Sequence, residues 1–88
     1  MMITTNLIGG LGNNLFQIAA AYALAKRNQD DFLLPSWKYA EFFNKMKPYN
    51  GEVIEHKHYQ KGHHYESIPY QKNMQIFGYY QSEKFFND

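Results

Sequence analysis

The chain has 88 residues, which allows one small domain with a limited core. Nine Lys and Arg residues against eight Asp and Glu residues give no electrostatic case for binding nucleic acid or an anionic membrane. The absence of cysteine excludes disulfides and thiolate metal sites, and no apolar run approaches the roughly 20 residues that span a membrane. With no basic, apolar leader at its start, the sequence predicts a cytoplasmic protein, or one peripheral to a membrane.

The first 35 residues predict a strand, a glycine-rich turn, a helix and a second strand. Residues 2–8 are rich in β-branched side chains and are followed by Gly9-Gly10, which favours a strand followed by a turn. The alanine-rich stretch 15–27 predicts a helix, with Asn13 or Asn14 as its N-cap. Residues 31–34, before Pro35, predict a short buried strand. This order is a βαβ unit with a right-handed crossover.

The rest of the chain carries weaker patterns. Aromatic residues between 37 and 43 suggest a short helix, and residues 48–51 form a turn pattern. Residues 52–59 and 73–80 are expected to be strands, separated by a polar loop over 60–73. Ser82 could cap a helix that begins at Glu83. The sequence therefore predicts an α/β fold with a small, mostly parallel sheet and flanking helices.

The turn Gly9-Gly10-Leu11-Gly12-Asn13 is the first candidate site. Glycine permits positive φ and close approach of a ligand to the backbone, and a helix N-terminus favours an anion such as a phosphate. A dinucleotide fingerprint is incomplete, since Leu15 stands where its third small residue belongs and no acid ends the second strand. A P-loop lacks its Gly-Lys pair. A tight turn that needs glycine only for its shape remains an equal alternative.

Two blocks of the sequence resemble the α-1,2-fucosyltransferases, glycosyltransferase family 11. Residues 9–26, GGLGNNLFQIAAAYALAK, are similar to the opening motif of that family, Gly-Gly-Leu-Gly-Asn-Gln-Met-Phe-Gln-Tyr-Ala, with departures at Asn14, Leu15 and Ile18. Residues 78–86, GYYQSEKFF, resemble its Gly-Tyr-Phe-Gln-Ser-Glu-Lys-Tyr-Phe segment. Together the blocks cover about 30 residues in the order the family has them.

The resemblance implies a GT-B-like architecture of two α/β domains with a donor cleft between them. Residues 1–88 would be the N-terminal part of the first domain, with the second domain absent. The donor would be GDP-fucose and the acceptor a galactose-containing glycan, joined with inversion and without a metal or cofactor. The residues expected to bind these substrates are Gly9, Gly10, Gly12, Asn13, Gly78, Gln81 and Ser82, with Asn13 the best candidate for a polar contact. The aromatic side chains of the second block, including Tyr79, are expected to pack in the core.

One departure from the family pattern limits how much of the family's activity can be assigned to this chain. The family has a downstream His-x-Arg-x-Gly-Asp-type donor motif, whose arginine offsets charge on the leaving diphosphate. This chain has one arginine, Arg27, and no His-x-Arg, so no catalytic residue is assigned. The expectation is an N-terminal fragment that is inactive alone and prone to self-association. The alternative is a non-catalytic remnant, or a nucleotide- or sugar-binding module. The acceptor and the oligomeric state are left open.

Histidines at His56, His58, His63 and His64 raise the possibility of a metal site, because alternate residues of a strand share one face. They lie in a polar stretch whose nearby carboxylates are Glu52, Glu55 and Glu66. A solvated loop is the favoured interpretation, and no metal site is predicted.

Overall fold

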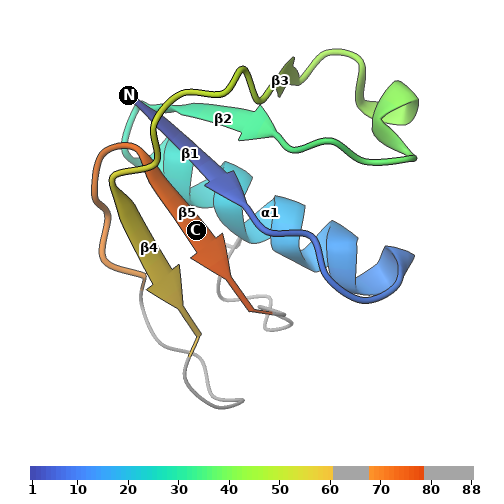
Figure 1. The fold of residues 1–88 in the computed structure, drawn as a ribbon, viewed down its shortest axis with the longest axis horizontal. Helices are drawn as coiled ribbons and strands as arrows, with labels where there is room; N and C mark the ends of the chain where they lie inside the picture. The colour runs from blue at the N-terminus through green and yellow to red at the C-terminus, as the bar shows by residue number, and fades with distance from the viewer. Residues whose placement is uncertain (61–67, 79–88) are drawn as a thin grey trace.

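The computed structural model describes residues 1–60 and 68–78. Its elements, in chain order, are β1 (Met2–Thr5), α1 (Leu11–Arg27), β2 (Asp31–Leu34), the 3₁₀ helix η1 (Ala40–Phe43), β3 (Lys47–Pro48), β4 (His56–Tyr59) and β5 (Met74–Phe77). Figure 1 shows β1 in the middle of the sheet and α1 lying along it. The predicted βαβ unit is confirmed as β1, α1 and β2.

The strands form one five-stranded sheet in the order β3-β2-β1-β5-β4. Every strand pair that the structure describes is parallel. β1 pairs with β2 on one side and with β5 on the other, where Thr5 lies opposite Ile76. From β1 the chain builds one half of the sheet and then crosses to build the other. The prediction of a small, mostly parallel α/β sheet is confirmed, and nothing in the structure tests the likeness to a GT-B domain.

Helix α1 covers one face of the sheet. Its small alanines, Ala20, Ala21 and Ala25, are buried and let the helix backbone approach the strands closely. Ile18 and Leu24 fill the remaining space between the helix and the sheet. The buried apolar cluster on this face consists of Ile3, Ile18, Ala20, Ala21, Leu24, Ala25, Phe32, Leu34, Ile68, Met74 and Ile76. Ile68 belongs to it although its segment, 60–73, was predicted to be a polar loop.

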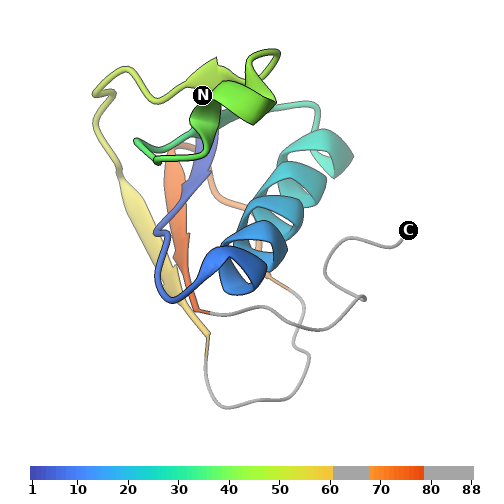
Figure 2. The same ribbon diagram turned by 90° about the vertical axis from the view of Figure 1, so that its right-hand side faces the viewer.

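The opposite face is covered differently. Parallel strands need long crossover connections, and Figure 2 shows the chain between β3 and β4 on the side of the sheet away from α1. All four residues of β1 are buried, including Met2 and Thr4, which alternate with the residues that face the α1 cluster. Thr4 Oγ1 donates a hydrogen bond of 2.7 Å to the carbonyl of Leu33. Both faces of the central strand are thus shielded, as is usual for parallel sheets.

Several element boundaries differ from the sequence predictions. The first strand ends at Thr5 rather than residue 8, because Gln17 holds the backbone of Ile8 in the following loop. Of the strands predicted over 52–59 and 73–80, the structure has β4 and β5, which pair over only four residues. Residues 79 and 80 lie outside the described part of the chain. The aromatic segment predicted as a short helix forms only the 3₁₀ helix η1. In the predicted turn at 48–51, Pro48 belongs to β3 and Gly51 takes φ +87°. The helix predicted from Glu83 lies outside the described residues.

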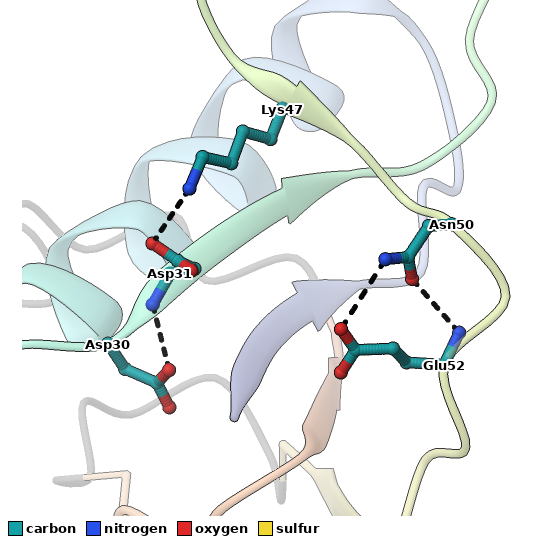
Figure 3. A network of polar contacts seen from close by, with 5 residues as sticks. All are labelled: Asp30, Asp31, Lys47, Asn50 and Glu52. Carbon is teal, nitrogen blue, oxygen red and sulfur yellow. Dashed lines mark hydrogen bonds and ion pairs between the residues drawn. The ribbon is translucent and has the colours of Figure 1, made fainter.

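Exposed polar contacts lie along β2, β3 and the turn after β3, as Figure 3 shows. Lys47 Nζ lies 3.4 Å from Asp31 Oδ1, and both side chains are more than half exposed. The Asp31 N–H donates to the side chain of Asp30. Across Gly51, the Glu52 N–H donates to Asn50 Oδ1 at 3.1 Å. The first contact joins the starts of β2 and β3, and the last lies in the turn that follows β3.

Candidate functional site

The loop between β1 and α1 needs glycine at one position and permits it at two others. Gly9 takes φ +79°, a conformation that a residue with a side chain rarely adopts. Gly10 is the N-cap of α1 with extended dihedral angles, and Gly12 lies in the first helical turn. A Cβ added at Gly10 or Gly12 would meet no atom within 4 Å among the described residues. The fold itself therefore gives no steric reason for glycine at positions 10 and 12.

The N-terminus of α1 has no side-chain cap among the residues that the structure describes. No acidic residue stands in its first turn. The N–H groups of Leu11 and Gly12 precede the first intrahelical hydrogen bond, which Asn14 donates to the Gly10 carbonyl at 3.0 Å. The prediction that Asn13 or Asn14 caps the helix is wrong, because α1 begins at Leu11 and places both asparagines inside it. The helix therefore presents an uncapped, positive end.

Two buried amides fix the path of this loop. Gln17 Oε1 accepts a hydrogen bond of 3.1 Å from the Ile8 N–H, and Gln17 Nε2 donates one of 3.1 Å to the Ile8 carbonyl. Asn14 Nδ2 donates to the same carbonyl at 3.0 Å and to Gln17 Oε1 at 3.2 Å. Gln17 is fully buried and Asn14 nearly so. We call Asn14 and Gln17 the amide clamp, which holds the loop rigidly in front of α1.

Trp37 extends the amide clamp to the next connection of the sheet. Its Nε1 donates a hydrogen bond of 3.0 Å to Asn14 Oδ1. The Trp37 ring lies 5.4 Å, centroid to centroid, from the rings of both Tyr39 and Phe43. The hydrogen bond from the partly buried Trp37 to Asn14 therefore joins the segment after β2 to the start of α1.

The glycine loop lies at the edge of the sheet formed by the carboxyl ends of its strands. β1 and β5 are neighbours at the point where the chain changes direction through the sheet, and such points are the usual ligand sites of parallel α/β folds. Backbone pairing continues past β1, since the Asn6 N–H donates to the Ile76 carbonyl at 3.0 Å. Gly78, with φ +139°, directly follows β5 at the same edge. Gln81 and Ser82 lie outside the described residues, as does Tyr79.

A groove of about 540 Å³ lies beyond the carboxyl ends of β2 and β3. Leu34 and Pro48, the last residues of the two strands, form part of its wall. Trp37 also lines it, so the residue that contacts the amide clamp contributes to the groove. Glycine loop and groove thus share one edge of the sheet.

Sequence reasoning placed the loop correctly but assigned its polar side chains to other roles. Asn13, the predicted ligand contact, is partly buried in the first turn of α1. The amide clamp and Trp37 were not foreseen. Amides at positions 14 and 17, three residues apart in an otherwise apolar helix, lie on the same face and are the signal that could have indicated a buried polar contact.

The histidines form no metal site in the part of the chain that the structure describes. His56 Nδ1 contacts the Lys72 carbonyl at 2.9 Å. No group of three or more His, Cys, Asp or Glu residues that could hold a metal occurs among residues 1–60 and 68–78. His63 and His64 lie outside this part. Within the same ranges, no helix combines the length and hydropathy that crossing a bilayer requires.

Comparison of the chain with protein-family models, with curated proteins and with solved structures finds no match. The geometry of the carboxyl edge and the two sequence blocks therefore define the candidate site. One of those blocks forms the loop and helix just described, and Gly78 of the other lies at the same edge.

Proposed function

We propose that this chain is the N-terminal α/β part of a fucosyltransferase-like glycosyltransferase, in which the glycine loop binds the diphosphate of GDP-fucose. The observation that carries the proposal is the uncapped N-terminus of α1 at the change of direction in the sheet. The acceptor is a galactose-containing glycan, to which an α-1,2-linked fucose is transferred. These substrates come from the resemblance of residues 9–26 and 78–86 to that family.

Three features of the loop support a phosphate ligand. The N–H groups of Leu11 and Gly12, which no side chain caps among the described residues, and the helix dipole favour an anion at this position. Glycines at positions 10 and 12 leave the backbone accessible. A glycine inside a helix costs about 0.5–1 kcal/mol relative to alanine, and no internal contact explains that cost at Gly12. A ligand that approaches the backbone closely would explain it.

We expect this chain to separate the binding of GDP from the transfer of fucose. Arg27, its one arginine, ends α1, about 24 Å from the glycine loop at 1.5 Å per residue. It cannot offset charge on a diphosphate held at the other end of the helix. We therefore expect residues 1–88 to bind GDP but to transfer no fucose by themselves.

Amide-shift titration by NMR tests the donor assignment. GDP should give saturable shifts at Gly9, Gly10 and Gly12, and NAD should give none, because the dinucleotide fingerprint is incomplete. Saturable NAD shifts at the loop with no response to GDP would contradict the proposal.

A chimera separates an enzyme part from a binding module. Residues 1–88 joined to the remaining portion of a full-length α-1,2-fucosyltransferase should transfer fucose from GDP-fucose to lactose. The matched control is the same chimera with Gly12→Asp, which places a carboxylate in the first turn of α1. A folded chimera that binds GDP at the loop but transfers nothing would favour the non-catalytic module.

The outer side of α1 supports the proposal of self-association. Leu11, Leu15 and Tyr22 are 45%, 43% and 41% exposed, and their spacing places them along one side of the helix. Sedimentation velocity should show a concentration-dependent dimer that Leu15→Lys weakens. A monomer at all concentrations would contradict it.

A further inference from the structure

The groove beyond β2 and β3 combines flat aromatic walls with a polar rim. Trp37, Phe43 and Tyr49 supply the aromatic surface, and Ser36, Glu41 and Asn44 supply hydroxyl, carboxylate and amide groups. We call these six residues the aromatic groove. Its volume, about 540 Å³, falls in the range of about 300–1,000 Å³ that is typical of small-molecule sites.

We infer that the aromatic groove binds a neutral sugar, and that it is the subsite for the acceptor glycan. This inference depends on the proposed function, because it assigns the second substrate of the same edge. A hexose offers an apolar patch of ring C–H bonds on one side and hydroxyl groups around its rim. Aromatic rings pack against the C–H patch, and carboxylate, amide and hydroxyl groups form hydrogen bonds with the sugar hydroxyls.

The charge of the groove argues against an anionic ligand. Glu41 is the one charged side chain that lines it among the described residues. A carboxylate repels phosphate, whereas it accepts hydrogen bonds from sugar hydroxyls. The glycine loop has the opposite character, since the N-terminus of α1 has no acidic residue in its first turn. The two neighbouring sites thus favour different halves of the proposed reaction, a diphosphate at the loop and a neutral polyol in the groove.

The aromatic groove is pre-organised. Trp37 Nε1 is held by Asn14 Oδ1 at 3.0 Å, which fixes the orientation of its ring. The Tyr49 N–H donates to the Leu34 carbonyl at 2.8 Å, and the Tyr49 hydroxyl donates to the Glu52 carbonyl at 2.5 Å. A ligand that stacks on rings already held in place loses less free energy to ordering them. The amide clamp fixes both the loop and Trp37, so it also sets the separation of the two sites.

Trp37 is the only tryptophan of the chain and lines the groove, so tryptophan fluorescence reports on changes at this groove. Lactose titrated into residues 1–88 should change the emission of Trp37 saturably, with a Kd of the order of 1–10 mM, as suits a small and shallow site. Because GDP absorbs ultraviolet light, its binding is followed separately through the amide shifts of Gly10 and Gly12. If GDP shifts the loop amides but lactose does not change the Trp37 emission, this inference is overturned. If lactose changes the emission but GDP does not shift the loop amides, the donor assignment is overturned.

Matched variants locate the sugar. Phe43→Leu removes an aromatic wall but keeps an apolar side chain, and should weaken lactose binding about threefold to tenfold. Glu41→Gln keeps the shape of the rim and should weaken lactose binding less than Phe43→Leu does. Phe42→Leu is the control, because Phe42 is adjacent but 74% exposed and does not line the groove. Circular dichroism establishes that each variant is folded.

Two further outcomes would overturn the inference. If Phe42→Leu weakens lactose binding as much as Phe43→Leu does, the sugar lies on the outer surface of η1 rather than in the groove. If GDP shifts the Trp37 indole resonance and lactose displaces it, the groove holds the nucleotide. If lactose leaves the amides of the loop unchanged while it saturates Trp37, the separate acceptor subsite is supported.

Discussion

The two edges of the sheet hold their polar groups in opposite ways. At the carboxyl edge, Gln17 and Asn14 are buried and bind the backbone of Ile8. At the amino edge, the Lys47–Asp31 contact is exposed to solvent. A groove of about 480 Å³ also lies at the amino edge, and its lining includes these two residues, with Lys26, Lys45 and Asp30 as further charges. Both edges therefore have a groove and a polar network.

Burial decides what each network can do. Buried amides that lose a partner leave donors or acceptors unsatisfied, which costs about 1–3 kcal/mol each. Exposed ion pairs contribute about 0–1 kcal/mol and are screened by salt. The carboxyl edge is therefore rigid and has an uncompensated helix N-terminus, whereas the lysines at the amino edge lie beside acids of their own. This difference is why we propose the carboxyl edge, and not the amino edge, as the ligand site.

Removing the amide clamp should have the largest effect. Gln17→Leu keeps most of the side-chain volume but deprives the Ile8 N–H of its acceptor and Asn14 Nδ2 of one of its two acceptors. We expect it to lower the free energy of unfolding by about 2–3 kcal/mol. Urea denaturation followed by circular dichroism measures the loss. Gln71→Leu, at an exposed position, is the control and should change stability by less than about 0.5 kcal/mol. Equal losses in the two variants would remove the contrast between buried and exposed polar groups.

A substitution at Gly12 should separate stability from ligand binding. Gly12→Ala should raise the free energy of unfolding by about 0.4–1 kcal/mol, because the position is helical and open. Gly12→Asp should also stabilise α1, since a carboxylate in the first turn interacts favourably with the helix dipole. It should nevertheless weaken GDP binding about tenfold more than Gly12→Ala does, a difference of about 1.4 kcal/mol from charge repulsion. GDP titration of both variants decides, and equal affinities would argue against a phosphate at this helix end.

The pH dependence of stability should come from the amino edge. Tyr70 donates a hydrogen bond of 2.7 Å to Asp30 Oδ2, which raises the pKa of Tyr70 above 10.0. Its contribution is complete below pH 10 and is lost as the pH rises through the folded-state pKa. The hydrogen bond from Asn73 to Glu55 lowers the pKa of Glu55 below 4.5, so that contribution is lost as the pH falls. The amide clamp does not titrate.

Two variants test these directions. Tyr70→Phe should flatten the decline in unfolding midpoint on the alkaline side, and Glu55→Gln should flatten it on the acid side. Each should leave the other side unchanged. If the unfolding midpoint of both variants depends on pH as steeply as that of the wild type, groups elsewhere control the pH response.

The smallest effect is expected from the exposed ion pair. Lys47→Met removes the contact with Asp31 and should cost no more than about 0.5 kcal/mol at low salt. The difference from wild type should vanish near 1 M salt, where the Debye length is about 3 Å. Thermal unfolding of Lys47→Met and the wild type at low and high salt measures this difference in stability. A loss comparable with that of Gln17→Leu would mean that the amino edge is as tightly held as the carboxyl edge.

The sequence by itself determined the βαβ unit and the position of the glycine loop. Periodicity and composition act locally, so the strand at 31–34 and the alanine-rich helix were predicted from neighbouring residues alone. The start of the helix was misplaced by four residues, because asparagines at 13 and 14 resemble caps. Only the folded chain shows that Asn14 instead binds the backbone of Ile8 and the ring of Trp37.

Tertiary structure decided the order of the sheet and the content of its carboxyl edge. β5 lies between β1 and β4, and Thr5 Oγ1 reaches the Ile76 carbonyl across 71 positions of sequence. Such pairings depend on which apolar faces can be buried together, and local patterns do not encode that choice. The same holds for the aromatic groove, which exists only because β2 and β3 end side by side. The sequence predicted the position of the glycine loop, and packing determined which residues form the groove at the same edge of the sheet.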